Sequence, residues 1–220
     1  MKPAFLSWAQ LYFHKGKTFL ATPRPFRSDI SLYFPNMQGY TLADPRNIYD
    51  TTSILRGKIS IVRLSSEQWA QSQCESFTDD IQNPLLVEET ERLKDKGVQM
   101  VNINIEEQWS KAILVRLSVR WHRKEVPKEE WPNTFMVRKG INDYTRRDLG
   151  VPNPRVGHVY VVDQNCKIRW AGCGNANDEE RDSLVMAVRR LAEPSRFVAQ
   201  EELESNKSVA KKPLRMALNR

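Results

Sequence analysis

Two compact runs of apolar and β-branched residues predict buried strands in the first half of the chain. The runs are Ile59–Leu64 and Val98–Ile105. Between them, residues 67–80 and 85–96 have the composition and apolar spacing of helices. A strand that returns to the same sheet through a helical crossover is parallel to the first strand. The first half therefore predicts a parallel β-α-β unit.

The second half of the chain predicts a β-hairpin followed by a closing helix. His158–Val162 and Lys167–Ala171 alternate or run apolar, and the turn residues 163–166 separate them. Asn177 then precedes an amphipathic segment, Asp178–Leu191, as a helix-capping residue does. These positions predict two antiparallel strands and one helix packed against them.

The intervening segments carry weaker signals. The longest helical candidate is Glu106–Lys124, and Pro127 ends it. Phe135–Arg138 is short and apolar, and Asn142–Leu149 predicts a brief helix. Residues 35–58 contain turn signals and a short helical stretch that ends at Leu55.

The order of these elements predicts a thioredoxin-like fold of the α/β class. A parallel β-α-β unit followed by an antiparallel hairpin and a closing helix gives a mixed sheet with flanking helices. The domain is expected to cover residues 31–194. Residues 195–220 are polar and predict a flexible tail.

The N-terminal segment has the composition of a mitochondrial transit peptide. Residues 1–28 contain no Asp or Glu, and they combine hydroxyl and apolar residues with five basic ones. We expect residues 1–30 to act as the targeting segment; the alternative is an ordinary basic tail. The basic residues are Lys2, Lys15, Lys17, Arg24 and Arg27.

Overall charge and hydropathy narrow the classes of partner. The 220-residue chain has a formal net charge of +7, which favours anionic partners. It contains no run of 18 apolar residues, so no spanning helix is expected. Motifs of RNA-binding domains and zinc fingers are absent, and we expect no nucleic-acid partner. A mitochondrial RNA- or ribosome-associated role is kept as an alternative.

The cysteines predict neither a disulfide framework nor a metal site. Cys74, Cys166 and Cys173 include no CxxC pair, and no histidine completes a zinc-binding spacing. Cys166 and Cys173 lie on either side of one predicted strand, about 23 Å apart if the chain is extended. Free thiols, no metal and no cofactor are expected.

The position of the thioredoxin redox motif is recognisable, but its cysteines are missing. In thioredoxins the motif Trp-Cys-x-x-Cys opens the helix after the first strand of the unit, where the helix N-terminus stabilises a thiolate. Here Trp69 is followed by Ala70 at the nucleophile position and by Gln73 at the resolving position. The cis-proline before the hairpin is also missing, since Gly157 precedes His158. No catalytic residue is therefore expected.

Cys74, one residue beyond this motif, leaves a redox alternative open. It could serve as a single-cysteine redox or peroxiredoxin-like site. The competing interpretation is a buried helical cysteine that packs as a small apolar residue. No basic residue lies near it in sequence to lower its pKa, which favours packing.

The helix predicted over residues 106–124 combines a basic face with an aromatic-edged apolar stripe. At 100° per residue, three of its arginines share one face. Such a surface suits an acidic or apolar partner, or a membrane surface. The alternative is a core helix with a solvated basic back. The partner- or membrane-binding candidates are Trp109, Lys111, Arg116, Arg120, Trp121 and Arg123.

Several motifs in order resemble the ATP10 family of mitochondrial ATP synthase assembly factors. They extend over residues 35–193, and the most specific is Cys-Lys-Ile-Arg-Trp-Ala-Gly-Cys-Gly at 166–174. The others lie at 35–42, 55–58, 66–70, 102–109, 111–117, 137–140 and 156–163.

This resemblance implies a function that the composition alone does not. It implies a non-enzymatic chaperone, bound peripherally at the matrix side of the mitochondrial inner membrane. Such a protein would act on subunit a (subunit 6) of the membrane sector of ATP synthase and on its association with the ring of subunit c.

Overall fold

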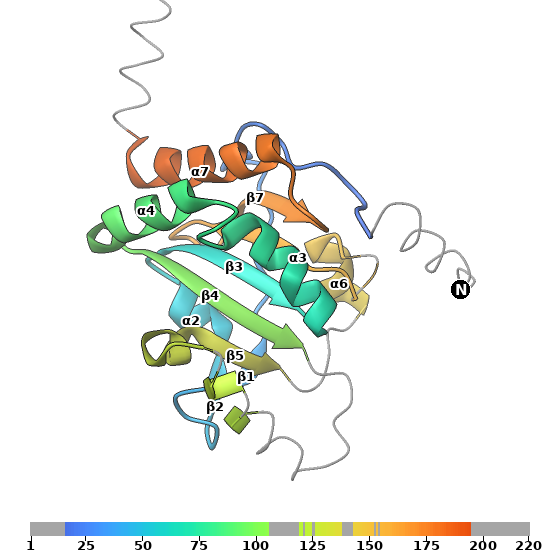
Figure 1. Cartoon of the computed structure of the whole chain (residues 1–220), viewed down its shortest axis with the longest axis vertical. Coiled ribbons are helices and arrows are strands. Elements are labelled where there is room, and N and C mark those ends of the chain that lie inside the picture. Colours follow the sequence, from blue (N-terminus) through green and yellow to red (C-terminus); the bar gives the residue numbers. More distant parts are fainter. Residues whose placement is uncertain are drawn as a thin grey trace, which may run out of the picture.

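A computed structural model describes residues 16–105, 119–137 apart from 121 and 125, and 143–194 apart from 152 and 154. Seven strands form one mixed sheet in the order β2-β1-β5-β4-β3-β6-β7 (Figure 1). The strands are β1 Gln38–Thr41, β2 Ile48–Asp50, β3 Ile59–Ser65, β4 Val98–Ile105, β5 Thr134–Val137, β6 His158–Val162 and β7 Ile168–Cys173.

The four strands at the centre and one edge of the sheet confirm the predicted unit. β3 and β4 are parallel, with Ile59 opposite Val98 and Ser65 opposite Asn104. β6 pairs antiparallel with β3, and β7 pairs antiparallel with β6. Every residue of β6 is buried, as expected for a strand with helices on both of its faces.

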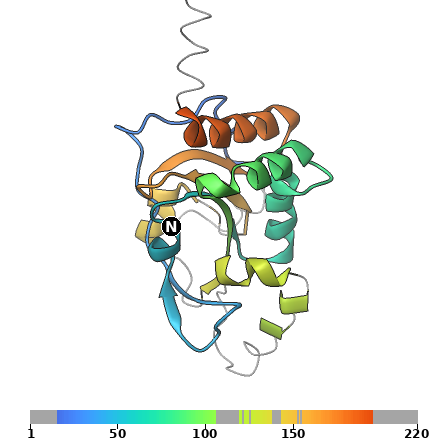
Figure 2. The ribbon, with the colours of Figure 1, turned by 90° about the vertical axis from the view of Figure 1, so that its left-hand side faces the viewer.

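Helices cover both faces of the sheet, and the sheet separates the core into two layers. In Figures 1 and 2, α3, α4 and α7 lie over one face, where Phe77 and Trp170 pack edge to face. Phe34, Leu149 and Tyr160 belong to the core of the other face. The helices are α2 Thr51–Leu55, α3 Gln68–Thr78, α4 Pro84–Arg92, α6 Asp143–Leu149 and α7 Asp178–Ala192, with 3-10 turns η1 Lys94–Lys96 and η2 Lys128–Asn133.

Two predicted elements differ from the structure. The segment expected to contain turns forms the hairpin β1–β2, which extends the sheet through β5. The single helix predicted over residues 85–96 is α4 followed by η1, because Leu93 leaves helical geometry and Gly97 adopts a left-handed conformation. The helix also begins one residue earlier than predicted, because Asn83 caps it and Pro84 occupies its first turn.

Residues 16–34, here called the N-terminal strap, lie along the outer edge of β7. The amide of Phe26 donates to the carbonyl of Arg169, and the amide of Ile168 donates to the carbonyl of Leu32. Phe34 donates from its amide to Cys166. These bonds engage backbone groups that an edge strand would otherwise expose.

A buried carboxylate fixes the start of the strap. Glu180 of α7 is 3% exposed and forms an ion pair with Lys17. It also accepts a hydrogen bond from the amide of Ala21 at 2.9 Å and completes the capping box of α7 with Asn177. The boundary predicted at residue 30 thus falls inside a segment that packs on the domain. Whether residues 1–30 act in targeting stays a prediction.

Candidate functional site: a closed redox position and an arginine pocket

The position that carries redox cysteines in thioredoxins is packed shut here. Trp69 and Ala70 lie in the first turn of α3, directly after β3, as predicted. Ala70 and Gln73 are fully buried, and Trp69 is 40% exposed. We call Trp69–Cys74 together with Gly157 the redox position. Neither an alanine nor a glutamine side chain can act as a nucleophile there.

Gly157 brings β6 into direct contact with the first turn of α3. Its amide donates to Oε1 of Gln73 at 2.9 Å. A Cβ on Gly157 would lie 2.1 Å from the carbonyl oxygen of Ala70 and 3.0 Å from Sγ of Cys74. Any side chain at 157 would therefore overlap the backbone of the helix. The segment before β6 and the first turn of α3 therefore touch each other at this position.

Cys74 lies in this contact as a neutral, buried thiol. Its Sγ is 3.5 Å from the carbonyl oxygens of Leu64 and His158. Burial raises its pKa to about 12, although the charge of Arg63 acts in the opposite direction. A thiol with this pKa does not supply a thiolate near neutral pH, and it is not accessible to a substrate. The geometry therefore favours the packing interpretation of Cys74 over the redox one.

His158 is the second buried titratable group beside the redox position. Its Nδ1 is 2.8 Å from the carbonyl oxygen of Val156, and its ring stacks on Tyr160. Burial lowers its pKa to about 4, so the imidazole is neutral at physiological pH. Its Nε2 is buried and has no hydrogen-bond partner among the described residues.

The N-terminal strap passes over the outside of the redox position. Gly16 is buried and has a φ of +79°, which favours glycine. A Cβ on Gly16 would lie 2.7 Å from Cγ2 of Val156 and 3.1 Å from Cη2 of Trp69. Thus Gly16 contacts both walls of the redox position and closes it further.

Polar side chains at the ends of β3 and β4 satisfy one another. Ser65 donates to Asn104 at 2.8 Å, and Asn102 donates to Thr134 at 3.3 Å. Nε of Arg63 donates to the side-chain oxygen Oδ1 of Asn102, so Arg63 is part of the same network. Among the described residues, no group of His, Cys, Asp and Glu is placed to hold a metal ion. These hydrogen bonds link the ends of β3, β4 and β5.

The structure describes only part of the predicted basic helix. Trp109, Lys111, Arg116 and Trp121 lie outside the described residues. Arg120 is exposed, as the predicted partner-binding face requires.

Arg123, in contrast, is engaged within the domain. It donates from Nε to the carbonyl of Leu42 at 2.8 Å, and its guanidinium lies 4.7 Å from the ring centroid of Trp131. Arg120 and Arg123 therefore do not form one free basic face in the structure. Whether residues 106–124 bind a partner stays a prediction.

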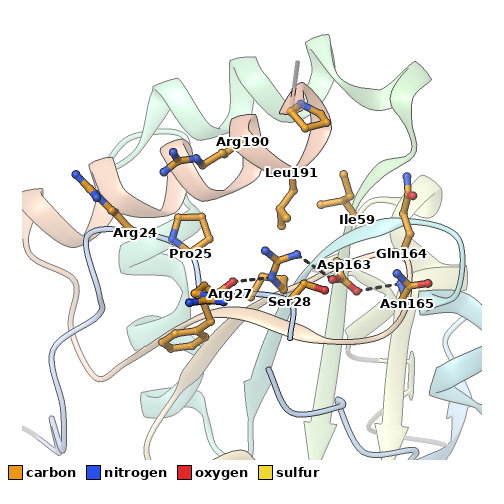
Figure 3. A pocket seen from close by; sticks show the side chains of 13 residues that line it. Arg24, Pro25, Arg27, Ser28, Ile59, Asp163, Gln164, Asn165, Arg190 and Leu191 are labelled. Atoms are coloured by element: carbon orange, nitrogen blue, oxygen red, sulfur yellow. Dashed lines mark hydrogen bonds and ion pairs between the residues drawn. The ribbon is translucent and has the colours of Figure 1, made fainter. Parts of the chain in front are cut away.

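A second site, which the sequence did not predict, is a pocket of about 590 Å³ between the strap, α7 and the turn that joins β6 to β7. We call it the arginine pocket because Arg24, Arg27, Arg169 and Arg190 line it. In Figure 3, Arg24 and Arg27 come from the strap, and Arg190 and Leu191 from α7. More than 140 positions separate the first two arginines from the last two, so only the tertiary fold reveals the pocket.

One arginine of the pocket is held rigidly. Arg169 donates from Nε to the carbonyl of Phe26 at 2.8 Å and from Nη1 to Asp163 at 3.1 Å. Asp163 in turn accepts hydrogen bonds from the amides of Asn165 and Lys167, which fixes the turn. Among the described lining residues, Asp163 is the only carboxylate and is thus neutralised, so the described lining is cationic.

Comparison with protein families gives a match that covers most of the chain. The model of the family described as ATP10 protein matches residues 1–191. The mitochondrial ATPase complex subunit ATP10 of Saccharomyces cerevisiae is 34% identical over 185 residues, covering 80% of this chain and 66% of that protein. The Candida glabrata protein of the same name is 30% identical and covers 80% and 63%. The chain spans slightly less than two thirds of the length of these relatives.

Solved structures confirm the thioredoxin-like fold. A secreted thiol-disulfide isomerase from Corynebacterium glutamicum superposes with a TM-score of 0.51 at 15% identity, covering 83% of this chain and 95% of that one. A DsbF homologue from Corynebacterium diphtheriae also gives 0.51, at 16% identity and with 79% and 94% covered. At these identities the likeness concerns the fold alone.

Proposed function

We propose that this chain, which belongs to the ATP10 protein family, is an assembly factor for the mitochondrial ATP synthase. The family match extends from residue 1 to residue 191 and so includes the strap, the sheet and nearly all of α7. The relatives carry the name of mitochondrial ATPase complex subunits. The proposal places this chain in the same compartment and the same complex.

The closed redox position carries the proposal that the protein works by binding and not by catalysis. Ala70 and Gln73 replace the two thiols, and Gly157 presses β6 against α3. The neighbouring Cys74 is neutral and buried. The thioredoxin-like scaffold is thus retained without a group that could exchange a disulfide. A folded scaffold of this kind can still present a surface to a client protein.

We further propose that the client is subunit a (subunit 6) and that the protein promotes its association with the ring of subunit c. Among the described residues, no helix is both long enough and apolar enough to span a membrane. The proposal is a peripheral protein at the matrix side of the inner membrane. The net charge of +7 supports attraction to an anionic membrane surface.

Expression of this chain in cells that lack their own ATP10 family protein tests the proposed function. We expect it to restore the assembled ATP synthase, measured on native gels and as inhibitor-sensitive ATP hydrolysis. Association of newly made subunit a with the chain, measured by crosslinking and mass spectrometry, tests the client. If the chain folds and enters mitochondria but assembly stays defective, the proposed function is wrong.

A cysteine-free variant tests the non-enzymatic part separately. Replacement of Cys74, Cys166 and Cys173 by Ser should leave assembly intact, because all three are free, buried thiols. A serine hydroxyl at 74 can donate to the carbonyl oxygens of Leu64 or His158 that Sγ now contacts. The matched control carries Ala at the same positions. If both variants fold and neither supports assembly, a thiol-dependent activity is required.

A further inference from the structure

The N-terminal strap combines cations with exposed apolar side chains in one short stretch. Leu20, Ile30, Leu32 and Tyr33 are 68%, 71%, 62% and 65% exposed. They lie on either side of Arg24 and Arg27 in sequence. Because Phe26 and Leu32 both hydrogen-bond to β7, this stretch lies at one edge of the domain. Large apolar side chains beside arginines at a surface are typical of proteins that bind at a membrane interface.

The arginine pocket has donors that its own fold leaves unused. The guanidinium of Arg24 has no hydrogen-bond or ion-pair partner among the described residues. Arg27 uses Nε and Nη2 on Asp29, and Arg169 uses Nε and Nη1 on Phe26 and Asp163. Nη1 of Arg27 and Nη2 of Arg169 remain available among the described groups. Arginine presents such hydrogens in a planar fork that matches phosphate oxygens.

The pocket also has an apolar side that suits a phosphate attached to a hydrocarbon group. Pro25, Ile59, Leu191 and Pro194 line it together with the arginines (Figure 3). Arg169 is largely buried, with 17% of its side chain exposed, while Arg27 is 78% exposed at the rim. Cationic charge therefore extends from the rim into the pocket.

We propose that the strap and the arginine pocket form a docking surface for a membrane that contains anionic phospholipids. Phosphate headgroups enter the arginine pocket, and Leu20, Ile30 and Leu32 insert between the lipids. This inference deepens the proposed function, since it assigns the peripheral membrane association to named residues.

The exposed apolar side chains favour a membrane over nucleic acid or an acidic peptide. Nucleic-acid surfaces for single strands place aromatic rings for base stacking, whereas Leu20, Ile30 and Leu32 offer only aliphatic groups. Tyr33 is exposed, and its ring is already engaged by Lys167, whose Nζ lies 5.4 Å from the ring centroid. Lys167 also donates to the carbonyl of Ser28, so it adds a further cation to the strap. Aliphatic insertion with several cations is the chemistry of a lipid interface.

Vesicle co-sedimentation of the full chain tests the docking surface. We expect binding to vesicles of phosphatidylcholine mixed with phosphatidylglycerol, weak binding to phosphatidylcholine alone, and a decrease with added salt. The double variant Arg24→Gln/Arg27→Gln should bind the anionic vesicles about 30-fold more weakly. Both side chains are exposed, and circular dichroism should show the fold unchanged. Binding equal to wild type would overturn the proposal.

A second variant tests the apolar contribution, and a matched control tests the choice of surface. Ile30→Ser/Leu32→Ser should weaken binding about tenfold without altering charge. The control Arg46→Gln/Lys128→Gln removes the same charge from exposed positions in the β1–β2 turn and in η2, away from β7 at the other edge of the sheet. It should bind within about twofold of wild type, since screened charges elsewhere contribute little. If the control weakens binding as much as the strap variant, attraction is not specific to the strap and the proposal fails.

Two competition experiments separate lipid from other anionic ligands. Inorganic phosphate at matched ionic strength should not displace the protein from anionic vesicles. Displacement by phosphate would identify a soluble phosphate ligand and overturn the lipid assignment. Displacement by a short single-stranded RNA at lower concentration than the lipid would assign the surface to nucleic acid instead. Failure of these binding experiments would leave the complementation result unchanged, so the two proposals can fail separately.

Discussion

The redox position and the arginine pocket lie in one thioredoxin-like domain and differ in what they expose. At the redox position Gln73 and Cys74 are buried, and the neutral thiol of Cys74 contacts backbone carbonyls. At the arginine pocket, cations line a cavity of about 590 Å³ that is open to solvent at its rim. The first region supplies packing, and the second supplies unused hydrogen-bond donors. A domain of this fold can thus lack the usual thiols at one position and present a cationic cavity at another.

The largest effect is expected where the redox position is closed. Gly157→Ala should destabilise the protein by about 3 kcal/mol or more, because the new Cβ would overlap the carbonyl of Ala70. Gly150→Ala is the matched control. Unlike Gly157, Gly150 has a positive φ, and it has open space around the added Cβ, so only backbone strain of about 1 kcal/mol should appear. Denaturant unfolding measures both. Equal effects would show that the contact at 157 can relax.

Acid should weaken the same region through His158. The unfolded histidine binds a proton below its ordinary pKa of about 6.5, whereas the folded one resists until about pH 4. Stability is therefore highest above pH 6.5 and falls as the pH drops toward 4, by about 2 kcal/mol between pH 7 and pH 5. The variant His158→Phe should lose this part of the slope. An unchanged slope would mean that the imidazole is accessible to protons in the native state.

A change at the strap tests whether that segment is part of the folded domain. Lys17→Met should cost about 2 kcal/mol, because it leaves the Glu180 carboxylate buried without its cation. Lys94→Met removes the cation of an exposed pair with Glu91 and should have no measurable effect. Thermal unfolding distinguishes the two. If both variants are as stable as wild type, the strap is dispensable for folding.

The smallest effect is expected in the helix predicted over residues 106–124, which carries the partner- or membrane-binding candidates. Arg123→Ala should cost about 1 kcal/mol, since it removes hydrogen bonds to Leu42 and Ala43 and the contact with Trp131. The exposed neighbour Arg120→Ala should be neutral. The opposite result, with stability retained and client crosslinking lost in Arg123→Ala, would support the predicted partner-binding face.

The strands that the sequence predicted correctly are long, apolar and formed by neighbouring segments. β-branched residues indicate the strands at Ile59–Leu64 and Val98–Ile105, and the tight turn at 163–166 indicates the hairpin. β1 and β2 have four and three residues, and β2 is exposed throughout. Their attachment to the rest of the sheet runs through β5, which is distant in sequence. No local apolar pattern could have indicated it.

Features of the candidate sites also differ in whether the local sequence could predict them. The missing thiols could be predicted because Trp69 sets the register for Ala70 and Gln73 within one helical turn. The contact of Gly157 with Ala70 could not, because it joins positions 87 apart and depends on how β6 meets α3. The acid-poor composition of residues 1–28 indicated targeting, yet Lys17 and Arg24 also belong to contacts with the domain or to the pocket. Composition alone does not distinguish residues that act in targeting from residues that contact the domain or line the pocket.

The strap joins the beginning of the described chain to its end, and this has a consequence for the order of folding. Lys17 is 163 positions from Glu180, and Phe26 is 143 positions from Arg169. Contacts with such separation close the longest loops of the molecule and form late. When the chain is made or translocated from its N-terminus, the strap emerges first and docks last. Until β7 and α7 have formed, its exposed Leu20, Ile30 and Leu32 remain available to chaperones.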